Sequence, residues 1–361
     1  MGIKIRENLE TLLPYPPGKP IEDVQREFNL ENIVKLASNE NPLGPSPKAV
    51  WAILDSVNEI NLYPDGNVFY LRKALSEKLK IKPENLIFGN GSDELIILIS
   101  QTYLDKDDEI IISDKAFIRY QMAAQVQNAK WISVPMIDYR HDLKGFVKAI
   151  TPKTKAIFID NPNNPIGTMV TKSEFEELIN SVPENVLIVM DEAYYEYIDD
   201  PDYPKTLDYL DKHKNIIILR TFSKIYGLAG IRLGYGIADA EIITNIDRVR
   251  PPFNVSRLAQ AAGLAAIDDK EHLERSRKTN KEGLKYIYGE LEKLGLKYVK
   301  SYANFVLIDM NKDGVKVFDD LQRLGVIVRP VKGYKLPNHI RVTIGTPEEN
   351  KIFIEALKKV I

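Results

Sequence analysis

Short apolar runs alternate with amphipathic stretches through the first two thirds of the chain, and this alternation limits the possible folds more than any other feature. Four of the runs are residues 109–113, 130–134, 155–160 and 186–191, and stretches of helical length such as 171–180 lie between them. Strands that alternate with helices in this way predict a mainly parallel sheet that is covered on both faces. Ligands of such sheets bind beyond the carboxyl ends of the strands, so polar residues at these ends are the first candidates for a site.

The pattern changes after about Pro252. A long helical stretch at 256–294, interrupted near Asp268, precedes a strand at 304–309, a helix at 315–324, strands at 326–329 and 339–344, and a final helix. The proline-rich stretch through Pro20 predicts an extended arm instead of a packed helix. We therefore expect an N-terminal arm (residues 1–40), a large domain (41–252) and a small C-terminal α/β domain (253–361).

Composition excludes several classes of protein. The chain has 361 residues, 44% hydrophobic and 28% charged, which is enough for two domains with sizeable cores. Its net charge is −2 and its basic residues form no long run, so we expect no nucleic-acid partner. It has no run of eighteen apolar residues and no signal-peptide pattern, so we expect a cytoplasmic protein without a membrane segment. With no cysteine and four scattered histidines, a metal site is not expected.

A lysine with unusual neighbours follows the apolar run 216–219. The stretch TFSKIYGLAGIRLGY combines the hydroxyls of Thr221 and Ser223 with Lys224, Arg232 and three glycines. Two hydroxyls and an arginine suit a bound phosphate, and glycines let the backbone approach a ligand. A partly desolvated, cation-rich loop favours the neutral form of a lysine amine, which a Schiff-base nucleophile requires. The alternative is a solvated lysine at the end of a strand.

This stretch resembles the cofactor-lysine loop of aminotransferases that use pyridoxal 5′-phosphate and share the aspartate-aminotransferase fold. Three more segments, PYPPGKP, LASNENPLGPSP and LYPDGN, resemble the histidinol-phosphate aminotransferase family in particular. The resemblance extends from about Tyr15 to the C-terminal helix. It implies a large cofactor-binding domain with a mainly parallel seven-stranded sheet flanked by helices, a smaller C-terminal α/β domain and an N-terminal arm.

The resemblance assigns roles around the cofactor ring. Asp191 would face the pyridine nitrogen, and Tyr194 and Asn164 would donate hydrogen bonds to the phenolic oxygen. Phe117 would stack on the ring, where the family usually has tyrosine, and Ile166 replaces the usual threonine. From the residues alone, Asp191 could equally be a helix N-cap, and Asn164 lies in NPNNPIGT, a turn by composition.

A phosphate site is expected where GNGSDE joins a strand to a helix. Backbone N–H groups at the start of a helix attract anions. Alone, glycines before a helix are a weak signal, but the resemblance makes this turn one half of a phosphate cup, in which Ser92 and Asp93 would donate through the backbone. The residues implied in the cup are Gly91, Ser92, Asp93, Thr221, Ser223 and Arg232, with Tyr63 reaching in from the neighbouring subunit of a homodimer.

Two arginines near the C-terminus point to the substrate. Arg329 and Arg341 occupy strand-like positions, and two guanidinium groups suit a phosphate dianion better than a single carboxylate requires. Either arginine alone could form a surface salt bridge instead. The resemblance further places Tyr15 against the substrate, and Asn39 and Glu40 at its imidazole end.

The function implied by the resemblance is the transamination of L-histidinol phosphate with 2-oxoglutarate, which gives imidazole-acetol phosphate and glutamate in histidine biosynthesis. A broad aromatic or general amino-acid aminotransferase on the same scaffold remains open. So do a pyridoxal-phosphate-dependent decarboxylase of threonine phosphate and, from another class of protein, a non-catalytic cofactor-binding module.

Overall fold

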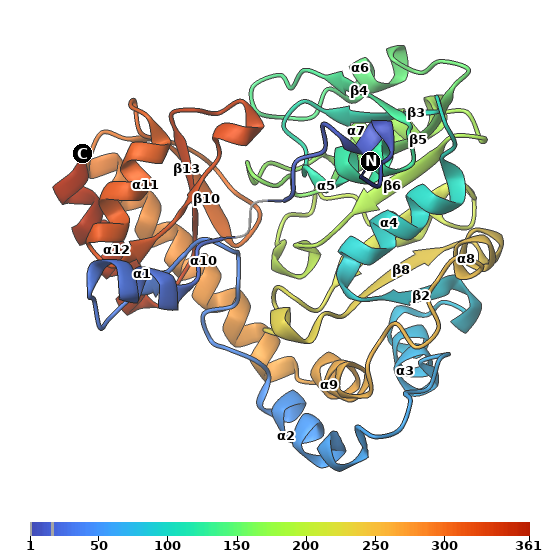
Figure 1. Cartoon of the computed structure of the whole chain (residues 1–361), viewed down its shortest axis with the longest axis horizontal. Coiled ribbons are helices and arrows are strands. Elements are labelled where there is room, and N and C mark those ends of the chain that lie inside the picture. Colours follow the sequence, from blue (N-terminus) through green and yellow to red (C-terminus); the bar gives the residue numbers. More distant parts are fainter. Residues whose placement is uncertain (1, 16–17) are drawn as a thin grey trace.

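The computed structural model describes residues 2–15 and 18–361, so Pro16 and Pro17 of the N-terminal motif lie outside the described residues. A seven-stranded sheet forms the centre of the larger of two bodies, on the right in Figure 1. Its order is β2 (Leu86–Gly89), β8 (Gly234–Ala238), β7 (Ile216–Thr221), β6 (Leu187–Asp191), β5 (Thr154–Asp160), β3 (Glu109–Ser113) and β4 (Lys130–Val134). Strands β3 to β7 pair in parallel, whereas β8 is antiparallel to both of its neighbours. The expected seven-stranded, mainly parallel sheet is confirmed.

Both faces of this sheet are covered by helices. In β7, Ile216 and Ile218 join one apolar cluster while Ile217 and Leu219 join the other, as the two-residue period of a strand requires. The face of Ile217 is covered by α4 (Gly91–Tyr103), α5 (Arg119–Val126) and α8 (Ala240–Asp247). The opposite face is covered by α3 (Phe69–Leu79), α6 (Leu143–Lys148), α7 (Lys172–Ser181) and α9 (Arg257–Ile267). Burial on both sides explains why these strands are apolar throughout.

The smaller body contains a four-stranded antiparallel sheet. Its order is β12 (Arg329–Pro330), β13 (His339–Thr343), β10 (Phe305–Asp309) and β9 (Lys297–Val299). The helices α10 (Lys270–Lys293), α11 (Gly314–Arg323) and α12 (Pro347–Val360) share its apolar core. The break expected near Asp268 is the gap between α9 and α10.

One expected strand is split. Residues 326–329 form β11 (Val326–Ile327), which pairs with β1 (Val34–Lys35), and the first residue of β12, which pairs with β13. The prediction of one strand here was wrong because β11 pairs in parallel with a segment almost 300 residues earlier. Nothing local in the sequence signals such a partner.

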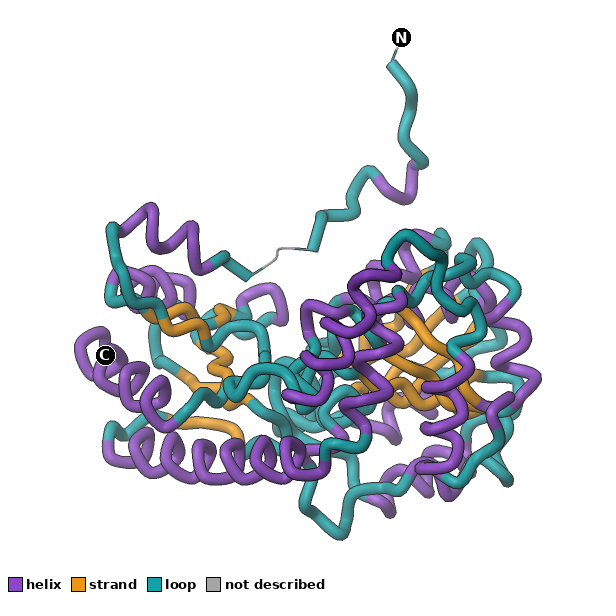
Figure 2. Tube along the Cα trace, turned by 90° about the horizontal axis from the view of Figure 1, so that it is seen from below, coloured by secondary structure: helices purple, strands orange, loops and turns teal. Residues whose placement is uncertain are grey.

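The N-terminal segment contacts both bodies. A 3₁₀ turn, η1 (Glu7–Leu9), lies against the end of α5, where Gln125 Nε2 donates to Asn8 O and to Thr11 Oγ1, both at 3.0 Å. Figure 2 shows this first segment projecting from the rest of the chain. Helix α1 (Ile21–Phe28) follows, and its Val24 packs beside Ile327 of the smaller body.

The division at residues 40 and 252 stays a proposal. The contacts favour assigning α1 and β1 to the smaller body and α9 to the larger one, where α9 packs against α2 (Pro47–Ser56) and α3. None of the helices in the described part of the chain is both long and apolar enough to cross a membrane.

Candidate functional site

A cavity of about 340 Å³ opens at the carboxyl ends of β5, β6 and β7, between the two bodies. It lies where the parallel sheet was expected to bind a ligand. Most of the predicted site residues line it, and these are Tyr15, Asn39, Ser92, Asp93, Phe117, Asn164, Asp191, Tyr194, Thr221, Ser223, Lys224, Arg232, Arg329 and Arg341. Residues that are 326 positions apart in the sequence thus share one cavity.

Lys224 lies three residues beyond the end of β7 and is partly exposed to this cavity. Its Nζ donates to the carbonyl of Ser38 at 3.2 Å and lies 5.8 Å from the ring centre of Tyr194. Burial, followed by the charge of Arg341, lowers the pKa of Lys224 to about 8. More of the amine is therefore neutral near physiological pH than for an ordinary lysine, and a nucleophile requires this neutral form.

Gly227 holds the lysine loop close to another segment. Its φ is +69°, and a Cβ atom there would lie 2.0 Å from the carbonyl oxygen of Gly44. A side chain would therefore push apart the lysine loop and the segment that carries Gly44.

Asp191 is the last residue of β6 and is buried. Tyr120 donates to its Oδ2 at 2.9 Å, whereas its Oδ1 is buried without a hydrogen-bond partner. Burial raises the pKa of the Asp191 carboxyl. An acceptor of this kind in a cavity wall fits a ligand that brings an N–H group, because buried polar atoms otherwise have partners.

Tyr120 was not predicted as a site residue. It is fully buried at the start of α5, and its ring packs edge-on against Phe117 with ring centres 5.8 Å apart. The sequence carried a weak signal for it, since a tyrosine in an otherwise apolar helical position needs a partner for its hydroxyl group.

Asn164 and Tyr194 both line the cavity and are each held by other groups. The side-chain oxygen of Asn164 accepts from Arg341 Nη1, and its backbone N–H donates to Asp160 Oδ2 at 2.9 Å. Asn39 Nδ2 donates to the Tyr194 hydroxyl at 2.8 Å, and burial raises the pKa of that hydroxyl. Both side chains are thus fixed before any ligand binds.

The start of α4 forms an anion site with Arg232. Arg232 donates to Asn90 O at 3.4 Å and to Ser223 Oγ at 3.3 Å. Gly91 is the first residue of α4 and has φ +75°, and a Cβ atom there would lie 2.4 Å from Arg232 Nη2. Gly91 does not line the cavity itself but leaves room for the guanidinium group. The N–H groups of this first turn and the helix dipole add to the attraction for an anion.

The ion pair with Arg119 reduces the repulsion between the carboxylate of Asp93 and an anion bound at the start of α4. Arg119 Nη2 donates to Asp93 Oδ2 at 3.1 Å, and Nε donates to Oδ1 at 2.5 Å. This arrangement fits the expectation that Asp93 contributes through its backbone.

Arg329 and Arg341 are direct partners on the neighbouring strands β12 and β13. The Arg329 guanidinium lies 5.7 Å from the ring centre of Tyr15. Arg341 is buried, its Nη2 donates to Ala37 O at 2.8 Å, and its Nε is buried without a hydrogen-bond partner. Their pairing places two cations on the wall of the cavity opposite to α4.

Besides Gly91, two predicted residues do not line the cavity. Glu40 forms an ion pair with Lys35 at 3.0 Å, although its charge still acts on Lys224. Tyr63 is 80% exposed and stacks on Phe253 with ring centres 4.7 Å apart. Within this subunit Tyr63 does not contribute to the cavity, so its expected role depends on a neighbouring copy of the chain.

Comparison with known proteins identifies the family. A family model described as aminotransferase class I and II matches residues 31–357. The chain belongs to this family. This aminotransferase is 49% identical over 359 residues to the histidinol-phosphate aminotransferase of Moorella thermoacetica, covering 99% of this chain and 93% of the relative. It is also 49% identical over 356 residues to that of Caldicellulosiruptor saccharolyticus, covering 99% of both chains. The expected resemblance to histidinol-phosphate aminotransferases is confirmed.

Solved structures agree with this fold. The histidinol-phosphate aminotransferase of Sinorhizobium meliloti in complex with pyridoxal-5′-phosphate matches with a TM-score of 0.91 at 26% identity, covering 99% of this chain and 98% of that one. The aspartate aminotransferase of Thermus thermophilus with maleate matches with a TM-score of 0.85 at 22% identity over 100% of both chains, which shows the fold alone.

The cavity of this aminotransferase fits pyridoxal 5′-phosphate. The unpartnered Oδ1 of Asp191 suits the protonated ring nitrogen, the amine of Lys224 suits the aldehyde, and the first turn of α4 with Arg232 suits the phosphate. The ring nitrogen, the aldehyde and the phosphate of the cofactor therefore each have a matching group at the cavity.

Proposed function

We propose that this aminotransferase transfers the amino group of L-histidinol phosphate to 2-oxoglutarate with pyridoxal 5′-phosphate as cofactor. The products are imidazole-acetol phosphate and glutamate, and the reaction belongs to histidine biosynthesis. The pairing of Arg329 with Arg341 across β12 and β13 carries the substrate assignment. The two histidinol-phosphate aminotransferases that align with almost the whole chain support this assignment. The expected cytoplasmic location stays a prediction.

Lys224, Asp191 and the residues around them would hold the cofactor. The bound cofactor supplies an electron sink for the carbon that carries the substrate amine. Asp191 would bind the ring nitrogen in its protonated form, Asn164 and Tyr194 would bind the phenolic oxygen, and Phe117 would pack against the ring. Lys224 would bind the aldehyde group of the cofactor, and its free amine would move the proton from the substrate carbon. Its lowered pKa leaves it able to accept that proton near pH 8.

The substrate phosphate would bind between the two arginines. A phosphate dianion has three acceptor oxygens, and guanidinium groups bind it with charge-assisted hydrogen bonds. Arg341 must hold the carboxylate of 2-oxoglutarate or glutamate in the other half of the cycle. Two of its five N–H groups donate to Asn164 and Ala37, so three, including the one at Nε, remain for either anion.

A half-reaction tests this substrate assignment. The purified enzyme with bound pyridoxal 5′-phosphate is mixed separately with histidinol phosphate, histidine, phenylalanine and aspartate, and the cofactor absorbance is followed. We expect conversion to the pyridoxamine form at micromolar histidinol phosphate and much weaker responses to the other three. Equal or faster conversion by phenylalanine or aspartate would identify a broad aminotransferase instead.

We also propose a homodimer in which Tyr63 completes the partner's cavity. Large apolar side chains are exposed in the segment 51–70, which contains Tyr63, and exposed apolar surface of this kind is typical of interfaces. They are Trp51, Leu54, Ile60, Leu62, Phe69 and Tyr70. A two-fold interface would place each Tyr63 near the other subunit's phosphate site.

Mixing two inactive variants tests this arrangement. Tyr63→Ala and Lys224→Ala homodimers are unfolded together and refolded as a mixture. If Tyr63 acts in the partner, half of the dimers are hybrids with one intact site each, so about a quarter of wild-type activity returns. If Tyr63 acts within its own subunit or has no role at the site, the mixture shows no activity beyond that of the separate variants.

A further inference from the structure

A second buried carboxyl group lies beside Asp191. Asp160 is the last residue of β5, and its Cα is the direct partner of Asp191 at the end of β6. Both residues are buried and both line the cavity. Adjacent parallel strands are about 4.8 Å apart, so direct partners carry their side chains on the same face at close range.

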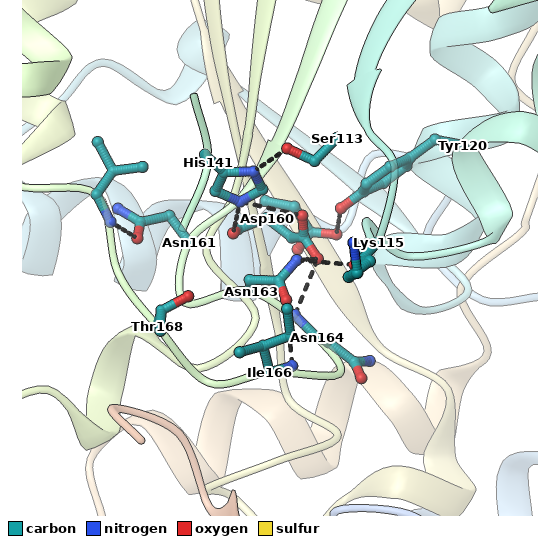
Figure 3. A network of polar contacts seen from close by, with 12 residues as sticks. Ser113, Lys115, Tyr120, His141, Asp160, Asn161, Asn163, Asn164, Ile166 and Thr168 are labelled. Carbon is teal, nitrogen blue, oxygen red and sulfur yellow. Dashed lines mark hydrogen bonds and ion pairs between the residues drawn. The ribbon is translucent and has the colours of Figure 1, made fainter. Parts of the chain in front are cut away.

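The Asp160 carboxyl holds the turn that carries Asn164, as Figure 3 shows. Its Oδ2 accepts from Asn163 Nδ2 and from the backbone N–H of Asn164, both at 2.9 Å. Its Oδ1 is buried without a hydrogen-bond partner. The carboxyl therefore fixes one ligand-facing residue by hydrogen bonds and keeps one oxygen unsatisfied.

His141 is the nearest basic group, but it does not neutralise Asp160. Its Nε2 lies 3.0 Å from the backbone oxygen of Asp160 and 3.5 Å from Oδ1. A carbonyl oxygen only accepts, so Nε2 carries the hydrogen, and Nδ1 then accepts from Ser113 Oγ at 2.6 Å. Burial lowers the pKa of His141 to about 4, so the ring is neutral near pH 7.

The other groups around the two carboxyls, including backbone N–H groups of Phe117 and Ala193, offset only part of the effect of burial on their pKa. Lys224 attracts Asp191, Tyr120 donates to it, and Asp93 of α4 repels it. Tyr334 of η7 (Lys332–Tyr334), on which the charge of Asp160 acts, is neutral near pH 7, because burial raises the pKa of its hydroxyl to about 12. Two neighbouring buried carboxylates repel each other, and this disfavours ionisation of both. In line with this, burial raises the pKa of each carboxyl, and the charge of Asp160 adds to the rise at Asp191.

We propose that Asp160 is a positioning residue of the cofactor site, which shares a proton with Asp191 in the empty pocket and loses it when a cationic ring nitrogen binds to Asp191. The inference rests on the proposed cofactor site. The ring cation cancels the repulsion between the two carboxylates, so both can ionise. The proton leaves the carboxyl pair for the ring nitrogen or for the buffer, and no other bond is made or broken.

Asp160→Asn tests this proposal because it removes the charge and keeps an oxygen that can accept from Asn163 and Asn164. Pyridoxamine 5′-phosphate, which has no aldehyde, is titrated calorimetrically into the cofactor-free full chain in two buffers of different ionisation enthalpy. The difference between the two heats gives the number of protons released on binding. We expect the wild type to release more protons near pH 7 than Asp160→Asn does, by about half a proton. Between pH 6 and pH 8 the affinity of the wild type for pyridoxamine 5′-phosphate should then rise about tenfold more than the affinity of Asp160→Asn.

Asp114→Asn is the matched control. Asp114 follows the next strand of the sheet, β3, but its carboxylate pairs with Lys115 at 2.8 Å, so its removal should leave the proton count at the wild-type value. If Asp160→Asn does not fold, Asp160→Ser replaces it, because serine is also uncharged and also accepts hydrogen bonds. Equal proton release by the wild type and a folded Asp160 variant would overturn the proposal. If the wild type does not bind pyridoxamine phosphate at all, the proposed function itself is wrong.

Discussion

The two walls of the cavity differ in charge and in construction. We call the ends of β5, β6 and β7 with the first turn of α4 the cofactor wall, and β12 and β13 with Tyr15 the arginine wall. The cofactor wall carries Asp160 and Asp191 on strands of the large sheet that are buried on both faces. The arginine wall carries Arg329 and Arg341, and β12 is only two residues long.

This difference separates the chemistry from the choice of substrate. Groups on the cofactor wall would touch the part of the reaction that is the same for every amino donor. Groups on the arginine wall would touch the part in which histidinol phosphate and glutamate differ. Substitutions on the first wall should therefore lower both half-reactions equally, and substitutions on the second should discriminate between them.

The largest effect is expected for Lys224→Ala on the cofactor wall. The loss of the amine that moves the proton should lower both half-reactions by at least about a thousandfold. The cofactor should still bind, because Asp191, Arg232 and the first turn of α4 remain. Single-turnover absorbance with histidinol phosphate and with glutamate measures this, and rates close to those of the wild type would contradict the role of Lys224.

On the arginine wall, Arg329→Gln should lower kcat/KM for histidinol phosphate much more than for glutamate. The loss of charge-assisted hydrogen bonds to the phosphate should cost about 2–3 kcal/mol, or roughly 30- to 150-fold in kcat/KM for histidinol phosphate. For glutamate we expect a loss below about threefold, because Arg341 holds the carboxylate.

Arg341→Gln is the matched comparison and should lower kcat/KM for both substrates. Similar losses for both substrates in Arg329→Gln would mean that Arg329 does not bind the substrate phosphate. The arginine wall would then not determine the choice of substrate through this residue.

Gly91→Ala probes how tightly the cofactor wall is built. The substitution forces a Cβ atom to within 2.4 Å of Arg232 Nη2 at a φ of +75°. Displacing this guanidinium should weaken the binding of pyridoxamine 5′-phosphate about tenfold. Separately, the left-handed backbone of an alanine should lower the free energy of unfolding by about 1–2 kcal/mol. Gly230→Ala is the control, since a Cβ atom there meets nothing within 4 Å. Equal affinities for the two variants would show that the contact between Gly91 and Arg232 is unimportant.

The cofactor wall was largely predictable from the sequence, because its motifs are local. Asp191 ends an apolar run, Lys224 follows another, and Gly91 opens a helix, so each position follows from one strand or helix. Parallel pairing then brings these ends together without further information.

Other parts of the site could not be predicted because they depend on contacts between distant segments. The alignment of Arg329 with Arg341 is set by the register of β12 on β13, and the split of residues 326–329 is set by pairing with β1. Asp160 was seen as the end of an apolar run, but its role depends on the neighbouring strand. Glu40 was placed in the cavity by resemblance, whereas in the structure its carboxylate binds Lys35.

The smallest predicted effect connects the two walls. Burial and then the charge of Arg341 lower the pKa of Lys224 to about 8, so the neutral amine predominates above that pH. Arg341→Gln removes a cation and should therefore raise this pKa by roughly one unit. The rate at which the cofactor-free enzyme attaches pyridoxal 5′-phosphate, followed by absorbance, should reach half its maximum at a correspondingly higher pH. Arg323→Gln, whose guanidinium lies over the ring of Phe28 at 5.2 Å, should leave the midpoint unchanged. An unshifted midpoint in Arg341→Gln would mean that the arginine wall does not tune the lysine and acts on the substrate alone.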